Sequence, residues 1–115
     1  MADIPPRVRH DVLARDRRCV ASILWPHVCR DAFGNVHPPT HLTKMELDHV
    51  RENPAMGETA TSIPEHLVTL CHFAHQTSHW ATRNRPVLRR YLDLCDGLRA
   101  PSVAAIRSLR RMVWP

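Results

Sequence analysis

The spacing of hydrophobic residues changes several times along this chain, and each change predicts a different element. Residues 5–18 carry apolar positions at helical spacing between arginines and acids, which predicts a short amphipathic helix. Residues 45–50 alternate between apolar and polar, which predicts a strand with Glu46 and Asp48 on one side. The apolar run at residues 66–70 predicts a second strand.

Helical spacing returns after the second strand and predicts three helices. Phe73, Trp80 and Ala81 give the first of them one apolar side. The second helix begins near Pro86, and a break at residues 97–101 separates it from the third. The apolar stripes of these last two helices are Val87, Leu88, Tyr91, Leu92 and Cys95, and then Val103, Ile106, Leu109, Met112 and Val113.

These elements predict one domain, residues 1–115, of the α+β class with a two-stranded antiparallel sheet. Glycine, asparagine and proline mark residues 30–43 and 51–65 as loops. The last helix, about residues 101–114, is predicted as an extension of the core. Because a chain of this size buries only about two-thirds of its unfolded surface, a metal cross-link would strengthen its modest core.

The chain is basic, and its basic side chains are almost all arginine. Sixteen Lys and Arg against eleven Asp and Glu give a net charge of +5 with neutral histidines, and Lys44 is the single lysine. The planar guanidinium group fits phosphate oxygens, so this bias indicates a polyanionic partner such as DNA. A solvated basic surface without such a partner explains the same count.

Cysteines and histidines supply more candidate ligands than a chain of this length ordinarily carries. No apolar run reaches the roughly 18 residues that span a bilayer, and the N-terminal MADIPPRVRHD has no hydrophobic signal segment. We therefore expect a cytoplasmic protein without a membrane partner. In a reducing compartment the four cysteines are expected as metal ligands or buried thiols, beside nine histidines.

The ligand-type side chains concentrate at the two predicted strands. Asp48 and His49 end the first, and the second continues as LVTLCHFAHQTSHW, residues 67–80, with one cysteine and three histidines. Together with an arginine-rich leading helix followed by a cysteine, this order resembles the HNH endonuclease family. Its members show an acidic residue and histidine, then Asn-Leu-hydrophobic-x-Leu-Cys, then a further histidine, on a ββα-metal frame. The resemblance covers about residues 7–95 and is nearest to small phage and bacterial HNH proteins.

The resemblance implies hydrolysis of DNA by a divalent cation and an imidazole base. His49 would take the proton of the attacking water, because imidazole has an ordinary pKa of about 6.5. Asp48 and His75 would hold Mg²⁺, Mn²⁺, Ni²⁺ or Zn²⁺, and His79, four residues on, would be a second histidine ligand on the same helical face. His66 stands where the family has an asparagine that orients the catalytic imidazole, and a histidine can still form that hydrogen bond.

Many members of the family also hold a structural zinc on two Cys-x-x-Cys pairs. Here Cys19, Cys29 and Cys71 would supply three sulfur ligands. A structural zinc takes four tetrahedral ligands, and His27 or His72 could be the fourth. The alternative is that the three cysteines are buried thiols without a metal.

The same resemblance implies DNA as the partner, and a phage terminase as a second partner. The candidate DNA contacts are Arg51, Arg83, Arg85 and Arg89, for which a solvated basic face is the alternative. Two other functions stay open. One is an HNH-fold module that binds DNA or assists packaging without catalysis, and the other is a small zinc-binding interaction protein.

Overall fold

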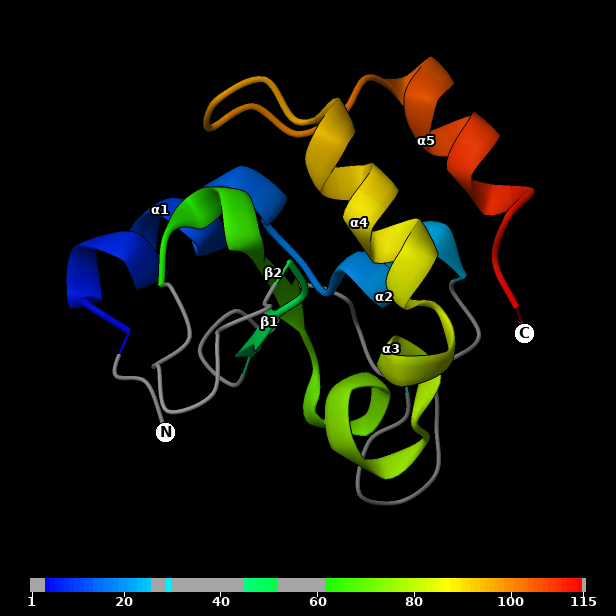
Figure 1. The fold of residues 1–115 in the computed structure, drawn as a ribbon, viewed down its shortest axis with the longest axis horizontal. Coiled ribbons are helices and arrows are strands. Elements are labelled where there is room, and N and C mark those ends of the chain that lie inside the picture. Colours follow the sequence, from blue (N-terminus) through cyan, green and yellow to red (C-terminus); the bar gives the residue numbers. More distant parts are fainter. Residues whose placement is uncertain (1–3, 26–28, 30–44, 52–61, 115) are drawn as a thin grey trace.

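The computed structural model describes residues 4–25, 29, 45–51 and 62–114. The elements, in order, are α1 (Pro6–Asp16), α2 (Val20–Leu24), β1 (Glu46–His49), a 3-10 turn (Pro64–His66), β2 (Leu67–Leu70), a π-helical turn (Phe73–Thr77), α3 (Trp80–Arg83), α4 (Arg85–Leu94) and α5 (Val103–Arg110) (Figure 1). The two strands form one antiparallel sheet among these helices, which confirms the predicted α+β class.

The two strands pair over their whole length, with Asp48 opposite Val68 and His49 opposite Leu67. Successive side chains of a strand point to opposite faces of the sheet. Val68 belongs to the main hydrophobic core, whereas Leu67 packs with Val12 of α1 in a smaller cluster. Asp48 therefore points to the face of the main core, and His49 points to the face on the side of α1.

Asp16, the last residue of α1, is a buried carboxylate that joins three elements. Its Oδ1 accepts hydrogen bonds from Arg15 Nε at 2.7 Å and from the Tyr91 hydroxyl of α4 at 2.8 Å. Its Oδ2 accepts the backbone N–H of Thr69 in β2 at 2.9 Å. Arg15 also donates to the carbonyl oxygen of Leu67 at 2.6 Å. One buried ion pair thus holds α1, β2 and α4 together.

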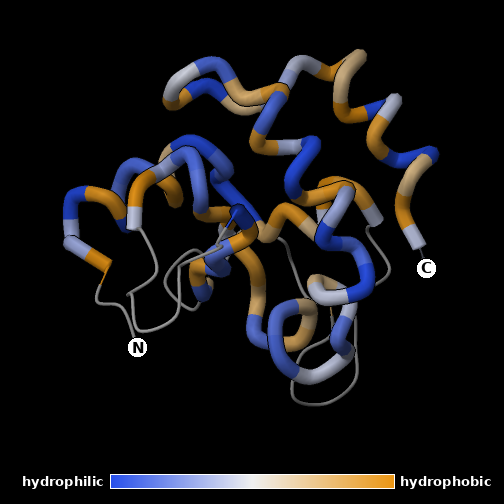
Figure 2. The backbone as a smooth tube through the Cα atoms, viewed as in Figure 1, coloured by the Kyte–Doolittle hydropathy of each residue, from blue (hydrophilic) through white to orange (hydrophobic). Residues whose placement is uncertain are grey.

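The two long C-terminal helices bury different amounts of their apolar stripes. Figure 2 shows hydrophobic and hydrophilic residues interleaved along α4, and its predicted stripe is buried at Val87, Leu88, Tyr91 and Leu92. In α5, Leu109 is buried, but Val103 is 76% exposed and Met112 is 50% exposed. The predicted stripe of α5 is therefore only partly buried, and the helix ends at Arg110, before Met112 and Val113.

The helix predicted after β2 is interrupted, which separates His75 from His79. Ser78 donates to the carbonyl oxygen of Phe73 from its backbone N–H at 2.8 Å and from its hydroxyl at 3.0 Å, and this closes the π-helical turn. His79 then adopts a left-handed conformation with φ 58°, and α3 begins at Trp80. This reversal carries Trp80 into the core, where it is fully buried.

We expect Asp16→Asn to lower the free energy of unfolding by about 3–5 kcal/mol, because the buried Arg15 then lacks its counter-charge. Tyr91→Phe removes one hydrogen bond from the same carboxylate and should cost about 1 kcal/mol. Urea unfolding followed by circular dichroism measures both values. Equal losses in the two variants would contradict the structural role of the ion pair.

Candidate functional site

Asp48 and His75 lie beside each other where the π-helical turn meets β1. His75 Nε2 is 3.5 Å from Asp48 Oδ1. Two atoms that each bind one cation at about 2.1 Å lie at most about 4.2 Å apart, so this distance fits two ligands of a shared ion. Asp48 is buried and His75 is half-buried. The structure therefore brings together the two residues that the sequence pairs as metal ligands.

Glu46 belongs to this site, although the sequence analysis gave it no role. Its Oε1 lies 2.8 Å from His75 Nδ1, and its Oε2 lies 2.7 Å from His72 Nδ1. Gln76 Nε2 donates to Oε1 at 2.7 Å. A carboxylate on Nδ1 fixes the ring and leaves Nε2, the nitrogen next to Asp48, as the one that binds a metal. The alternation of apolar and polar residues in β1 places Glu46 and Asp48 on the same side of the strand, and this pattern could have predicted that Glu46 lies at the site.

The two carboxylates favour a protonated His75 when no metal is bound. The hydrogen bond to Asp48 is the largest cause that raises the pKa of His75 above its ordinary 6.5, and the hydrogen bond to Glu46 adds to it against the effect of burial. Burial acts to raise the pKa of Glu46, but its hydrogen bonds with His72, His75 and Gln76 outweigh burial and leave that pKa below 4.5. The site therefore attracts positive charge.

The second oxygen of Asp48 has no hydrogen-bond partner within the described residues. Asp48 Oδ2 is buried, and its ion-pair partner, Arg85 Nη2, is 3.8 Å away. A buried carboxylate oxygen is costly unless a cation or a donor satisfies it. The carboxylate of Asp48, whose Oδ1 approaches His75 Nε2, and the imidazole of His75 form an oxygen and nitrogen donor set that suits a divalent metal ion. The residues present therefore fit the cation that the sequence analysis expected.

Among the described residues, the side chain within hydrogen-bond distance of His49 is that of Ser62, and no side-chain bond joins His66 to His49. His49 Nε2 is 3.1 Å from Ser62 Oγ. His66 acts through its backbone, whose carbonyl oxygen accepts the N–H of Val50 at 2.8 Å. Its buried Nδ1 has no hydrogen bond in the described part of the chain. The backbone of His66 thus extends the strand pairing. Arg85 Nη1 donates a hydrogen bond to the carbonyl oxygen of His49 at 3.2 Å.

His79, expected as a second histidine ligand, does not join Asp48 and His75. It is exposed at the left-handed turn before α3. Across residues 4–25, 29, 45–51 and 62–114, the only group of three or more ligand atoms within 4.8 Å of one another consists of cysteines. The expectation fails because the chain reverses at His79 and breaks the helical turn that would align it with His75.

Cys19, Cys29 and Cys71 form that buried cluster. The Sγ atoms of Cys19 and Cys29 are 3.6 Å apart, and all three lie within 4.8 Å of one another. Sulfur ligands of a tetrahedral zinc, each at about 2.3 Å, lie about 3.8 Å apart. The backbone N–H of Cys71 donates to Cys19 Sγ at 3.2 Å, and that of Ala74 donates to Cys71 Sγ at 3.4 Å. This geometry is compatible with a zinc site.

A fourth zinc ligand is not visible among the described residues. His27 lies outside them. His72 is exposed, and its Nδ1 lies 2.7 Å from Glu46 Oε2. Burial raises the pKa of Cys19 to about 12, so without a metal its thiol stays protonated at neutral pH. Cys95, which the apolar stripe of α4 placed in the core, is half-buried against the main core and outside the cluster.

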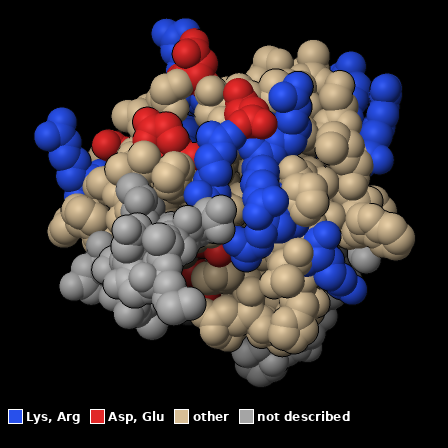
Figure 3. All heavy atoms as spheres, in the orientation of Figure 1, with Lys and Arg blue, Asp and Glu red and all other residues tan. Residues whose placement is uncertain are grey.

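The four arginines expected to contact DNA differ in their surroundings. Basic side chains gather over α4 on the face that Figure 3 shows. Arg83 and Arg89 are exposed, and neither forms an ion pair with a described residue. Arg85 is half-buried and directed at the candidate site. Arg51 forms an ion pair with Asp93. Arg83 and Arg89 are thus the two whose charge has no carboxylate partner in the described chain.

Comparison of the chain with models of protein families, with curated proteins and with solved structures finds no match. None of the helices that the structure describes has the length and apolar character needed to cross a lipid bilayer. A function for this protein therefore rests on the geometry of its own site.

The stability of the protein without a divalent cation at this site should depend on the protonation of His75. Because the folded pKa of His75 is raised, its contribution is complete below pH 6.5 and is lost as the pH rises through the folded pKa. We expect the free energy of unfolding in EDTA to fall above pH 6.5, and His75→Gln to reduce that fall. His72→Gln, which changes an exposed histidine on the same carboxylate, is the matched control. An unchanged pH dependence in His75→Gln would contradict this assignment.

Proposed function

We propose that this protein is a metal-dependent HNH endonuclease that hydrolyses phosphodiester bonds in DNA. The observation that carries the proposal is the 3.5 Å approach of Asp48 and His75 next to His49, the last residue of β1. In the proposed ββα-metal frame, β1 and β2 are the strand pair, and the π-helical turn with α3 takes the place of the metal-binding helix.

Asp48 and His75 would hold the divalent cation, which is Mg²⁺, Mn²⁺, Ni²⁺ or Zn²⁺. The carboxylate of Asp48 and the Nε2 atom of His75 would supply the ligand atoms. A bound cation would neutralise charge on the scissile phosphate and assist the leaving oxygen. Glu46 acts behind His75 as a positioning residue, because its hydrogen bond to Nδ1 fixes the ring and increases the basicity of the other nitrogen.

His49 is the proposed general base. Because adjacent residues of a strand point to opposite faces, His49 approaches a bound phosphate from a different side than Asp48 does. In the tautomer whose Nε2–H donates to Ser62 Oγ, the Nδ1 atom is unprotonated and accepts the proton of the attacking water. Ser62 would therefore orient the imidazole of His49, as the asparagine is expected to do in the HNH family.

DNA is the proposed partner, and its phosphates would meet the arginine side chains over α4. Arg83 and Arg89 are exposed for this contact, and Arg85 stands between the backbone of His49 and the carboxylate of Asp48. Guanidinium groups bind phosphate oxygens in a bidentate manner. By the same resemblance, a phage terminase is the proposed protein partner.

His49→Ala should lower the rate of plasmid nicking by about 10²–10⁴-fold, which is the usual contribution of general-base catalysis. DNA affinity and melting temperature should stay near those of the wild type, since the one hydrogen bond of this side chain with a described residue is that to Ser62. His79→Ala, which changes an exposed histidine, should nick at the wild-type rate. The assay compares the three proteins with a series of divalent ions.

Two results would contradict the nuclease proposal. Nicking by His49→Ala at the wild-type rate would remove His49 as the base. Salt-dependent DNA binding by the wild type, with no metal-dependent cleavage, would instead support the DNA-binding or packaging-accessory module.

We also propose a structural zinc on the cysteine cluster. The purified protein should contain one zinc that is absent from Cys71→Ser and retained in Cys95→Ser, because Cys95 lies outside the cluster. The melting temperature should fall in Cys71→Ser and after chelation. Elemental analysis and thermal unfolding measure these effects. A zinc-free wild type whose melting temperature does not respond to chelation would show that the three cysteines are buried thiols only.

A further inference from the structure

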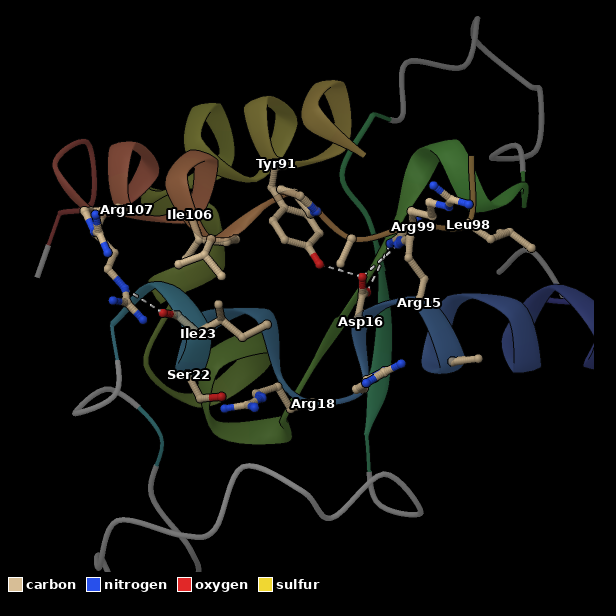
Figure 4. A pocket seen from close by; sticks show the side chains of 16 residues that line it. Arg15, Asp16, Arg18, Ser22, Ile23, Tyr91, Leu98, Arg99, Ile106 and Arg107 are labelled. Atoms are coloured by element: carbon tan, nitrogen blue, oxygen red, sulfur yellow. Dashed lines mark hydrogen bonds and ion pairs between the residues drawn. The ribbon is translucent and has the colours of Figure 1, made fainter. Parts of the chain in front are cut away.

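A hollow lies away from the residues of the proposed active site, between the end of α1, α2, α4 and α5 (Figure 4). Its volume is about 860 Å³, which is within the range of pockets that bind ligands. Arg15, Asp16 and Tyr91 form its floor, where their hydrogen bonds satisfy one another. The floor is therefore a structural part of the fold, and the rim is the part that can meet a partner.

Five further arginines line the hollow, and none of them forms an ion pair with a described residue. They are Arg17, Arg18, Arg99, Arg107 and Arg110. Asp16 is the one carboxylate of the lining, and Arg15 and Tyr91 already occupy it. An accumulation of like charge in a concave surface focuses the electrostatic field and favours an anionic ligand.

Aliphatic side chains accompany these arginines. Val103 is 76% exposed and Leu98 is 51% exposed, while Ile23 and Ile106 are partly buried beside them. Figure 4 shows Ile106 and Ile23 facing each other across the hollow. Exposed aliphatic groups gathered in one place indicate a surface that a partner covers, because their burial is favourable by about 25 cal/mol per Å².

The rim is held in place by hydrogen bonds of its own. Arg110 Nε donates to the carbonyl oxygen of Ile23 at 3.0 Å, which ties α5 to α2. Asp96 and Arg99 exchange two backbone hydrogen bonds of 3.1 and 3.0 Å around Gly97, whose φ is 60°. The hollow is thus formed before a ligand arrives, which lowers the cost of binding.

We propose that this hollow binds an acidic segment of a protein partner. Glutamate or aspartate side chains of that segment pair with the arginines, and an aliphatic side chain packs on Leu98, Val103 and Ile106. Single-stranded nucleic acid is the weaker match, because single strands stack on exposed aromatic rings and the one aromatic side chain of the lining, Tyr91, is fully buried. A polypeptide supplies both carboxylates and aliphatic groups.

Fluorescence anisotropy with a labelled peptide of repeated Glu-Glu-Leu-Leu units tests this proposal. The wild type should bind it, and both Arg107→Glu and Val103→Ser should weaken binding by about tenfold or more, a loss of about 1.4 kcal/mol. Arg7→Glu, at an exposed arginine of α1 outside the hollow, is the matched charge reversal and should leave peptide binding unchanged. A peptide with Gln in place of Glu, and one with Ser in place of Leu, should each bind more weakly.

Three outcomes would overturn the proposal. The first is no binding of the acidic peptide by the wild type. The second is an equal loss in Arg7→Glu and Arg107→Glu with no loss in Val103→Ser, which would mean attraction by net charge alone. The third is a loss of affinity for duplex DNA in Arg107→Glu while peptide binding is unchanged, which would assign the hollow to nucleic acid.

Discussion

The fold depends on a buried ion pair, Arg15 with Asp16, that fixes β2 between α1 and α4. Asp16 accepts the backbone N–H of Thr69 and the hydroxyl of Tyr91, and Arg15 binds the carbonyl oxygen of Leu67. Because a buried carboxylate is tolerated only when its charge and hydrogen bonds are satisfied, β2 has little freedom to move or change register. The position of β2 also fixes the π-helical turn that follows it. This turn carries His75, whose imidazole contacts Asp48 of β1.

At the candidate site negative charge is in excess, whereas the charges of Arg15 and Asp16 balance each other. Glu46 and Asp48 flank the imidazole of His75, and one buried oxygen of Asp48 has no hydrogen bond in the described chain. A proton on His75 compensates part of this negative charge in the absence of a metal, and a divalent cation would compensate more of it. Proton and metal therefore compete for the same imidazole, as expected for histidine ligands in general. The same competition would apply to a zinc at the cysteine cluster, because burial raises the pKa of Cys19.

The periodicity of apolar residues predicted which face of a single strand or helix is buried, because this depends on residues close together in the sequence. The alternation of β1 placed Glu46 and Asp48 on one side, and the stripe of α4 predicted its buried face. The role of Ser62 could not be predicted, because it depends on how a distant segment approaches His49. The failure at His79 came from one residue in a left-handed conformation, which helical periodicity cannot detect. The hydrogen bonds that Asp16 accepts from Thr69 and Tyr91 likewise join distant segments, so no local pattern reveals them.

The central claim is that Asp48 and His75 share one divalent cation. Anomalous diffraction from crystals of the protein soaked in Mn²⁺ tests it most directly. The account predicts an anomalous peak about 2.0–2.2 Å from a carboxylate oxygen of Asp48 and from His75 Nε2. Strong peaks elsewhere in the crystal with none at this position, or a peak there that Asp48 does not contact, would contradict it.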